Sequence, residues 1–163
     1  KETAYRFLGE PYCKETNKSL LLKPIFDGKI IHNFNNKDFY PIPNVKIVLV
    51  HFRKKKYDDL KSRSYIAYLD LISYLFVNYV SFKDATKNIF SFEQQKRIKK
   101  EINVDWEKPI SSLKYEQWLK IYNAFYSFSN EKSKSIIKNS YKKKLSRQKN
   151  IREKHGTRKR KFQ

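Results

Sequence analysis

Residues 24–51 read PIFDGKIIHNFNNKDFYPIPNVKIVLVH, and this stretch decides the fold class of the chain. It contains three runs with the β-branched and aromatic content of strands, at residues 29–34, 37–42 and 45–50. Asn35 and Asn36 separate the first two runs, and asparagine tolerates the left-handed backbone conformation that a two-residue hairpin turn requires. The stretch therefore predicts a small antiparallel sheet. Upstream of it, residues 19–22 are either a helix end or a further strand.

Downstream of this stretch, the spacing of apolar residues changes from that of a strand to that of a helix. Apolar side chains three or four residues apart predict a helix over roughly 57–81, and a second helix is expected over 92–102. A third helix should follow Ser111 and Ser112, which can cap it, and its aromatic stripe should pack on that of the first helix. The sequence thus predicts an α+β fold with a small antiparallel sheet core, a helical insertion and an extended basic C-terminal tail.

Composition divides the chain into three regions. Residues 1–56 contain the predicted strands and form a mixed core, residues 57–130 are helical, and residues 131–163 are basic. From residue 132 onward there are 14 Lys and Arg residues and one acidic residue, Glu153. Such a segment cannot bury itself, although a helix can begin near residue 136, so we expect it to become ordered only against a partner.

The charge of the whole chain points to a polyanionic partner. The 37 Lys and Arg residues against 16 Asp and Glu residues give a net charge of +21. A free protein gains nothing from that self-repulsion, whereas each contact with a nucleic-acid phosphate releases condensed counterions. An anionic membrane surface is the second candidate. The basic runs alone do not distinguish RNA, DNA and anionic lipid; they lie at residues 53–56, 142–144 and 158–161.

The residue usage also bears on the source of the gene. The 12 Tyr and 12 Phe residues, with many Lys, Asn and Ile residues, are what A+T-rich codons produce, and they indicate an organelle or another A+T-rich genome. Met is absent, so we expect a sequence that lacks its initiator through processing or trimming.

The search for a catalytic or metal site finds no candidate. No two of His32, His51 and His155 stand at the spacing of metal ligands, and there is no Gly-rich phosphate loop or Gly-x-Ser-x-Gly motif. Cys13, the single cysteine, rules out an internal disulfide and is expected to be a packing residue. The sequence therefore predicts no catalytic residue, no metal and no cofactor, and a protein that is not an enzyme.

Two blocks of the opening stretch resemble a known family. PIFDG at residues 24–28 and NNKDFYP at residues 35–41 match, in the same register, the Pro-x-Phe-x-Gly and Asn-Gly-Lys-x-Phe-x-Pro elements of small-subunit ribosomal protein nineteen, except that Asn36 replaces Gly. Either His51 or His155 stands where that family has the His of its C-terminal Gly-His-Lys motif. By this resemblance, residues 1–56 are a ribosomal-protein-like core, residues 57–130 are an insertion, and residues 131–163 rejoin the family.

The resemblance implies a structural constituent of the small subunit of an organellar ribosome, which binds rRNA in the subunit head near the decoding region. The implied partners are small-subunit rRNA, ribosomal protein thirteen and other head proteins, and tRNA near the C-terminal tail. The mitochondrial matrix is preferred as the location, and a plastid is the alternative. What the insertion contacts and which rRNA helices are bound stay open.

A second interpretation comes from the apolar run between residues 65 and 80, which basic segments flank. It would fit a structural accessory subunit of an organellar membrane complex. Asp70 interrupts the run, and its uncharged part is shorter than the roughly 20 residues that a membrane span needs. A packed helix is therefore the preferred interpretation, and we expect no membrane span.

The residues expected to contact RNA are cations that neutralise phosphate, with one tyrosine beside the predicted turn as a stacking platform. Three lysines follow from the resemblance, the runs at 53–56 and 158–161 from both the resemblance and their charge, and the others from the basic tail. Tyr40, with Phe39 beside it, is the stacking candidate because RNA bases stack on aromatic rings. The complete set is Lys23, Lys29, Lys37, Tyr40, Arg53, Lys54, Lys55, Lys56, Lys142, Lys143, Lys144, Arg147, Arg158, Lys159, Arg160 and Lys161.

Overall fold

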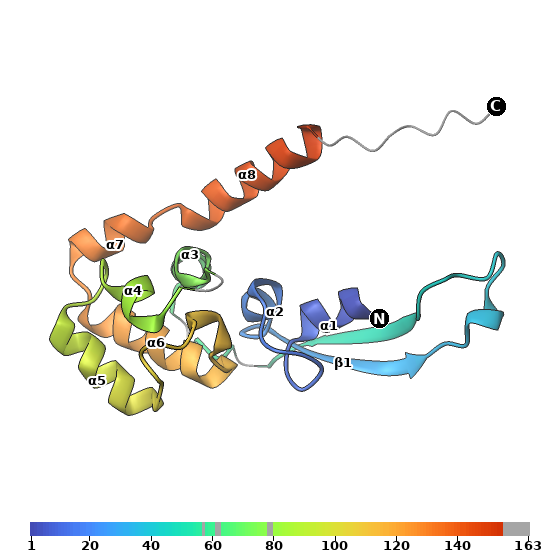
Figure 1. Cartoon of the computed structure of the whole chain (residues 1–163), viewed down its shortest axis with the longest axis horizontal. Coiled ribbons are helices and arrows are strands. Elements are labelled where there is room, and N and C mark those ends of the chain that lie inside the picture. The colour runs from blue at the N-terminus through green and yellow to red at the C-terminus, as the bar shows by residue number, and fades with distance from the viewer. Residues whose placement is uncertain (57, 61–62, 78–79, 155–163) are drawn as a thin grey trace.

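The computed structural model of the chain describes residues 1–56, 58–60, 63–77 and 80–154 (Figure 1). Its helices and strands follow one another as α1 (Glu2–Leu8), α2 (Asn17–Leu22), β1 (Phe26–Asn33), β2 (Val48–Lys54), α3 (Tyr65–Leu75), α4 (Phe82–Thr86), α5 (Phe92–Ile102), α6 (Tyr115–Phe128), α7 (Glu131–Ile137) and α8 (Ser140–Lys154). Short 3-10 turns are η1 (Asn36–Asp38) and η2 (Ile110–Ser112). The prediction of an α+β fold with a small antiparallel sheet is confirmed, and the described sheet has two strands.

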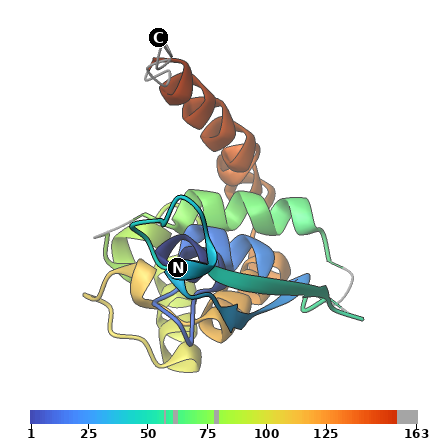
Figure 2. The same ribbon diagram turned by 90° about the vertical axis from the view of Figure 1, so that its right-hand side faces the viewer.

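Helices α3 to α6 form a body from which two elements project (Figure 1). The β1–β2 hairpin extends to one side of the body, with α1 and α2 at its base. Helix α8 leaves the body after α7 and projects toward the same side. Seen along that direction, α8 rises clear of the hairpin, and α3 lies between the two (Figure 2).

Strand β1 pairs with β2 in antiparallel register, from Phe26 opposite Lys54 to Asn33 opposite Val48. Successive side chains of a strand point to opposite faces. One face of the hairpin lies against α1, where a Cβ atom at Gly28 would come within 2.5 Å of Leu8. The opposite face is open to solvent.

The second predicted strand, residues 37–42, is not formed, and this prediction is wrong. The turn η1 takes its place. The side-chain oxygen of Asn35 accepts the N–H of Lys37 at 3.0 Å, and Asp38 accepts the N–H of Asn35 at 3.0 Å. Asn and Asp side chains compete with strand pairing in this way. The two asparagines therefore open a long connection, residues 34–47. The second strand of the sheet is Val48–Lys54, which shares only residues 48–50 with the third predicted run.

The hydrophobic core lies among the helices, which corrects the expectation of a core built on the sheet. The largest fully buried side chains include Trp118, Tyr68, Tyr122 and Phe82. The aromatic stripes of α3 and α6 pack on one another as predicted. The rings of Tyr68 and Tyr122 meet edge to face with centroids 5.3 Å apart, and those of Phe76 and Trp118 are 5.9 Å apart. Such pairs stabilise a core beyond the area they bury.

The first predicted helix, over 57–81, is shorter in the structure. Helix α3 begins after Ser64, whose hydroxyl accepts the N–H of Ala67 at 3.3 Å, and it ends at Leu75. The apolar pattern continues past that end because Phe76 packs on the core from a non-helical segment. The predicted positions 57, 61, 62, 78 and 79 lie outside the described residues.

The other predicted helices are formed with smaller adjustments. Helix α5 has the predicted bounds, because Ser91 and Gln94 form a capping box and Asn103, at φ 48°, ends the helix. Residues 19–22 belong to helix α2 and not to a strand. Helix α6 begins at Tyr115 instead of directly after Ser112, whose hydroxyl is occupied in η2, where it donates to the carbonyl of Pro109 at 2.7 Å.

Within the described ranges, no helix has both the length and the apolar character that crossing a membrane requires. The division of the chain at residues 56 and 130 stays a prediction.

Candidate nucleic-acid interface

The solvent-facing side of the hairpin presents polar and basic side chains. Lys29 lies opposite His51, and Asp27 lies opposite Arg53, whose guanidinium is 3.5 Å from the Asp27 carboxylate. All four side chains are exposed. We call Lys29, His51 and Arg53 the hairpin outer face. Because they share one face of a two-stranded sheet, the positive charges of Lys29 and Arg53 can meet one phosphate backbone together, with the His51 ring beside them. Lys54 and Lys56, at and just beyond the end of β2, are also exposed.

The connection between the strands places two further predicted RNA contacts on the surface. Lys37 is exposed in η1, and the side chain of Tyr40 is entirely exposed. The neighbouring Phe39 packs on Phe34, with ring centroids 5.4 Å apart. Tyr40 is thus free of the packing that holds Phe39, and its role as a stacking platform stays a prediction.

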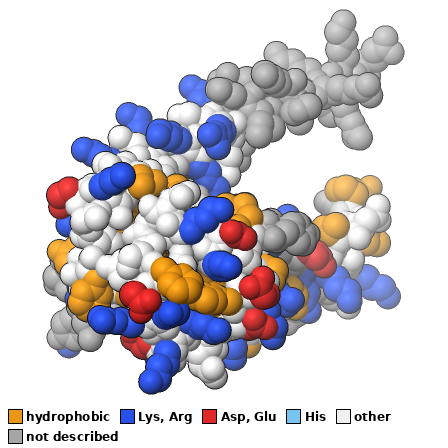
Figure 3. All heavy atoms as spheres, turned by 60° about the vertical axis from the view of Figure 1, so that its left-hand side comes forward, with side chains coloured by type: hydrophobic (Ala, Val, Ile, Leu, Met, Phe, Trp, Pro, Cys, Tyr) orange, Lys and Arg blue, Asp and Glu red, His pale blue; other side chains and the backbone are white. Residues whose placement is uncertain are grey.

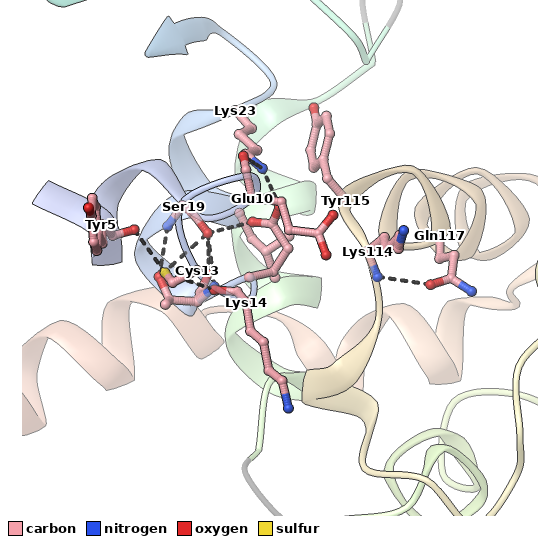
Figure 4. Close-up of polar contacts among 12 residues, drawn as sticks. Tyr5, Glu10, Cys13, Lys14, Ser19, Lys23, Lys114, Tyr115 and Gln117 are labelled. Atoms are coloured by element: carbon pink, nitrogen blue, oxygen red, sulfur yellow. Dashed lines mark hydrogen bonds and ion pairs between the residues drawn. The ribbon is translucent and has the colours of Figure 1, made fainter. Parts of the chain in front are cut away.

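Lys23 lies in a buried polar cluster at the base of the hairpin (Figure 4). Its ammonium group forms an ion pair with Glu15, whose side chain is 1% exposed. The Ser19 hydroxyl donates to the other oxygen of Glu15 at 2.6 Å. A buried carboxylate needs such partners, because burial without them is costly. Lys23 therefore has a partner inside the protein, which its sequence context did not indicate.

Lys55 lies in a second cluster at the same base. Its ammonium group is 2.5 Å from Asp59 and 3.7 Å from Asp27, and the Tyr115 hydroxyl donates to Asp59 at 2.7 Å. Burial, together with the hydrogen bond to Asp59, raises the pKa of Tyr115 above its usual value, so its hydroxyl stays protonated and keeps donating. The ammonium groups of Lys23 and Lys55 are 5.6 and 5.7 Å from the Tyr115 ring centroid. These contacts join the hairpin to α6.

The basic C-terminal helix presents most of its predicted contacts to solvent. Lys142, Lys143 and Arg147 are exposed on α8, and Lys and Arg side chains follow one another along it (Figure 3). Lys144 is partly buried, and this burial lowers its pKa. The remaining predicted contacts Arg158, Lys159, Arg160 and Lys161, as well as His155, lie outside the described residues.

Two separate basic surfaces result, one on the hairpin and one on α8. Among the described residues, no three His, Cys, Asp or Glu side chains gather as a metal ion would require. Cys13 is partly buried, and its thiol donates to the carbonyl of Tyr5 at 3.1 Å. Burial raises the pKa of this thiol, which suits a packing residue and not a nucleophile.

Sequence reasoning missed the residue that holds α8. Asp70 lies on α3 and is 7% exposed, whereas the sequence marks it only as an interruption of an apolar run. Its carboxylate accepts the backbone N–H groups of Asn139 and Tyr141, both at 2.9 Å. The available signal was the position itself, since a carboxylate inside an apolar helical stripe must find a donor.

Comparison with known proteins gives a family for this fold. The model of the family described as ribosomal RNA adenine dimethylase matches residues 1–127. An rRNA adenine N-6-methyltransferase of Bacillus licheniformis is 28% identical over 104 residues, and one of Bacillus anthracis is 27% identical over 104 residues. Each alignment covers 63% of this chain and 36% of the relative, so the chain spans about a third of the length of these curated relatives.

A solved structure shares the fold. The crystal structure of the 23S rRNA methyltransferase ErmE superposes with a TM-score of 0.66 at 16% sequence identity. The superposition covers 77% of this chain and 52% of that chain.

These findings overturn the resemblance to small-subunit ribosomal protein nineteen. The matching blocks are short, and most of their matched positions are the Pro, Gly, Asn and aromatic residues that many strand–turn segments contain. The predictions of a ribosomal structural protein and of a protein that is not an enzyme are wrong, because the matching family is one of rRNA-modifying enzymes. The expectation of ribosomal head proteins as partners gains no support from this family.

Two other expectations from the sequence, a contact with tRNA and a membrane-complex subunit, are also without support. The expected contact with tRNA rested on the resemblance to the ribosomal protein, and the alternative of a membrane-complex subunit gains no support from the relatives. The location stays a prediction, because neither fold nor family fixes a compartment. The family model covers the α1–α2 segment, the hairpin and the helical body almost to the end of α6, and the chain belongs to the ribosomal RNA adenine dimethylase family.

Proposed function

We propose that this chain forms the RNA-binding part of an rRNA adenine N6-methyltransferase. The observation that supports this most is the family match over residues 1–127. The relatives from both Bacillus species are named for this activity. The net charge of +21 is an independent reason to expect a polyanionic substrate.

The reaction fixes what an RNA-binding surface must do. The lone pair of the adenine N6 attacks the methyl carbon of a donor, the bond from that carbon to the leaving group breaks, and one proton leaves N6. An adenine inside a duplex cannot present N6 to a donor, so such enzymes act on unpaired or extruded bases. The surface must therefore hold the backbone and leave the base free, and contacts to phosphate do this.

A methyl donor is implied by this chemistry. The cavity at the base of the hairpin is lined by Lys23 and Lys55 together with Glu10 and Asp27, and both ammonium groups are paired with carboxylates inside the protein. We derive no step through the donor, and the role proposed for the described residues is to position RNA.

The hairpin outer face supplies the first test. Replacing Lys29 and Arg53 together by Ala should weaken binding of the chain to an rRNA fragment by roughly tenfold at 0.1 M salt, equally for all sequences, because two phosphate contacts are lost. The slope of log K against log salt should become shallower by about 1.4 to 1.8. Fluorescence anisotropy across a salt series measures both quantities.

A matched control removes the same charge elsewhere. Lys96 and Lys100 are exposed on α5, on the body away from the hairpin, and their joint replacement by Ala should leave affinity and slope nearly unchanged. Equal losses in the two double variants would show that net charge, and not the hairpin outer face, determines binding.

The activity itself is tested in cells with the whole gene product. Nucleosides from the rRNA of cells with and without the gene are analysed by mass spectrometry for N6-methyladenine and N6,N6-dimethyladenine. We expect one of these nucleosides to decrease when the gene is deleted and to return when it is restored. Identical rRNA nucleosides in the two strains would refute the proposed activity.

A further inference from the structure

We propose that α7 and α8 form an added RNA-binding arm, which contacts the phosphate backbone through basic side chains outside the segment that the family model matches. We call residues 131–154 the arm. The family model ends at residue 127, so the whole arm follows the matched region. The proposal rests on rRNA as the substrate of the proposed function, and it concerns a surface that the family match does not include.

One side of α8 packs against the rest of the protein, and the other side carries exposed basic side chains, as an RNA-binding arm requires. Tyr141, Lys144, Leu145 and Gln148 line a groove that α8 forms with α2 and α3. They are three or four residues apart, so they share one side of the helix. This side attaches the arm to the body.

The opposite side of α8 is basic. Lys142 and Lys149 are seven residues apart, and Lys143 and Arg147 are four apart, so the four lie along one broad helical surface. All four are exposed. Among the described residues, no carboxylate pairs with Lys142, Lys143 or Arg147. Their charge is therefore available to phosphate, in contrast to that of Lys23 and Lys55 at the base of the hairpin.

Asp70 sets the position of the arm. Its two carboxylate oxygens each accept one backbone N–H at 2.9 Å, from Asn139 and Tyr141 at the start of α8. The first turn of a helix has unpaired N–H groups and the positive end of the helix dipole, so a carboxylate is favoured there. Asn139 turns the chain with φ 63°, and Ile137 just before it is buried. The start of the arm is thus fixed to α3, and α8 projects beyond the body (Figures 1 and 2).

The composition of the basic side favours RNA over a lipid surface. A helix that binds in a membrane interface needs an apolar face to insert. On the side of α8 that carries Lys142 and Lys149, the other exposed residues are Lys143, Ser146 and Arg147, none of them apolar. Leu145, which is 46% exposed, lies on the side that lines the groove. A purely cationic surface gains instead from releasing counterions around a phosphate backbone.

The test measures RNA binding by the full 163-residue chain. Replacing Lys142, Lys143 and Arg147 together by Ala should weaken binding to an rRNA fragment by roughly 10- to 100-fold at 0.1 M salt and make the salt slope shallower by about 2 to 3. The matched control removes three charges from α5 by replacing Lys96, Arg97 and Lys100 with Ala. A similar loss in both triple variants would overturn the arm proposal.

The substitution Asp70→Asn tests whether the position of the arm, and not only the net charge of the chain, determines RNA affinity. The substitution raises the net charge of the chain by one. If net charge alone determined RNA affinity, the variant would bind equally well or more tightly. If Asp70 positions the arm, binding should weaken several-fold, because the asparagine side chain has one acceptor oxygen where two N–H groups need one each. Glu116→Gln, an exposed site on α6, changes the charge equally and should not weaken binding. Circular dichroism checks that each variant is folded; tighter binding by folded Asp70→Asn would contradict the proposal.

The outcome is independent of the proposed activity. If RNA binding depends on the arm but rRNA nucleosides are unchanged in cells without the gene, the arm proposal is supported and the methyltransferase proposal is refuted. If the nucleosides change but RNA binding does not depend on the arm, the methyltransferase proposal is supported and the arm proposal is refuted. Vesicles of phosphatidylcholine and phosphatidylserine provide the last comparison: if the α8 triple variant loses vesicle binding while RNA binding is unchanged, the arm binds lipid and the proposal is wrong.

Discussion

Replacing Trp118 by Ala is expected to lower the free energy of unfolding by about 3–5 kcal/mol, the range for truncating a fully buried tryptophan. Trp118 is fully buried on α6, and its ring packs against Phe76, 5.9 Å away between centroids. The vacated space opens between α6 and the segment that follows α3, where rigid helices cannot easily collapse. Chemical denaturation of the chain measures the effect, and the midpoint of thermal unfolding should fall by roughly 6–20 °C.

Two further substitutions sharpen this prediction. The indole N–H of Trp118 has no hydrogen-bond acceptor among the described residues. Trp118→Phe removes that unpaired group while keeping most of the ring, so we expect a cost of only about 1 kcal/mol. Phe128→Ala, at a residue 70% exposed on the same helix, should change stability by less than about 0.5 kcal/mol. If Trp118→Ala cost no more than Phe128→Ala, the assigned core would be incorrect.

Replacing Glu15 by Ala is expected to lower the free energy of unfolding by about 3 kcal/mol, because it leaves an ammonium group without its partner in a mostly buried site. The Lys23 side chain is 21% exposed and Glu15 is 1% exposed. The change also removes the acceptor of the Ser19 hydroxyl. Urea denaturation of the variant measures the loss.

A double-mutant cycle tests whether the ion pair or the packing matters. Glu15→Gln keeps the size of the side chain and an acceptor for Ser19, so it should cost less than Glu15→Ala. Replacing Glu15 and Lys23 together by Leu removes both charges, and we expect a cost well below the sum of the single Leu substitutions. Strict additivity of the two would show that no pairing energy links them.

The predictable parts of the fold were those that short sequence windows specify. The bounds of α5 follow from a capping box and a terminal Asn, both visible within a dozen residues. The packing of the α3 and α6 aromatic stripes followed from their spacing alone. The connection between the strands was mispredicted at Asn35, because its side chain bonds to the backbone of η1, and propensity does not separate that turn from a hairpin.

The sequence predicted the kind of partner that the candidate site binds, but not which individual residues face that partner. A net charge of +21 is a sum over residues, so it indicated a polyanionic partner without any structure. It could not tell which lysines face that partner. Lys29 and Lys143 are exposed, whereas the charges of Lys23 and Lys55 are paired with carboxylates. The resemblance to a ribosomal protein misled for a related reason, since two short blocks can match by chance in a chain of biased composition, whereas the family model matches residues 1–127.

The sequence by itself determined the α+β class, the helical periodicity of the body and the sign of the partner's charge, because these depend on composition and on residues a few positions apart. Only the tertiary structure decided which carboxylates neutralise which lysines and where α8 points. Asp70 and Asn139 are 69 positions apart, yet one hydrogen bond of 2.9 Å between them helps to fix the arm. No local pattern encodes such a pairing, since it exists only once α3 and α8 have packed together.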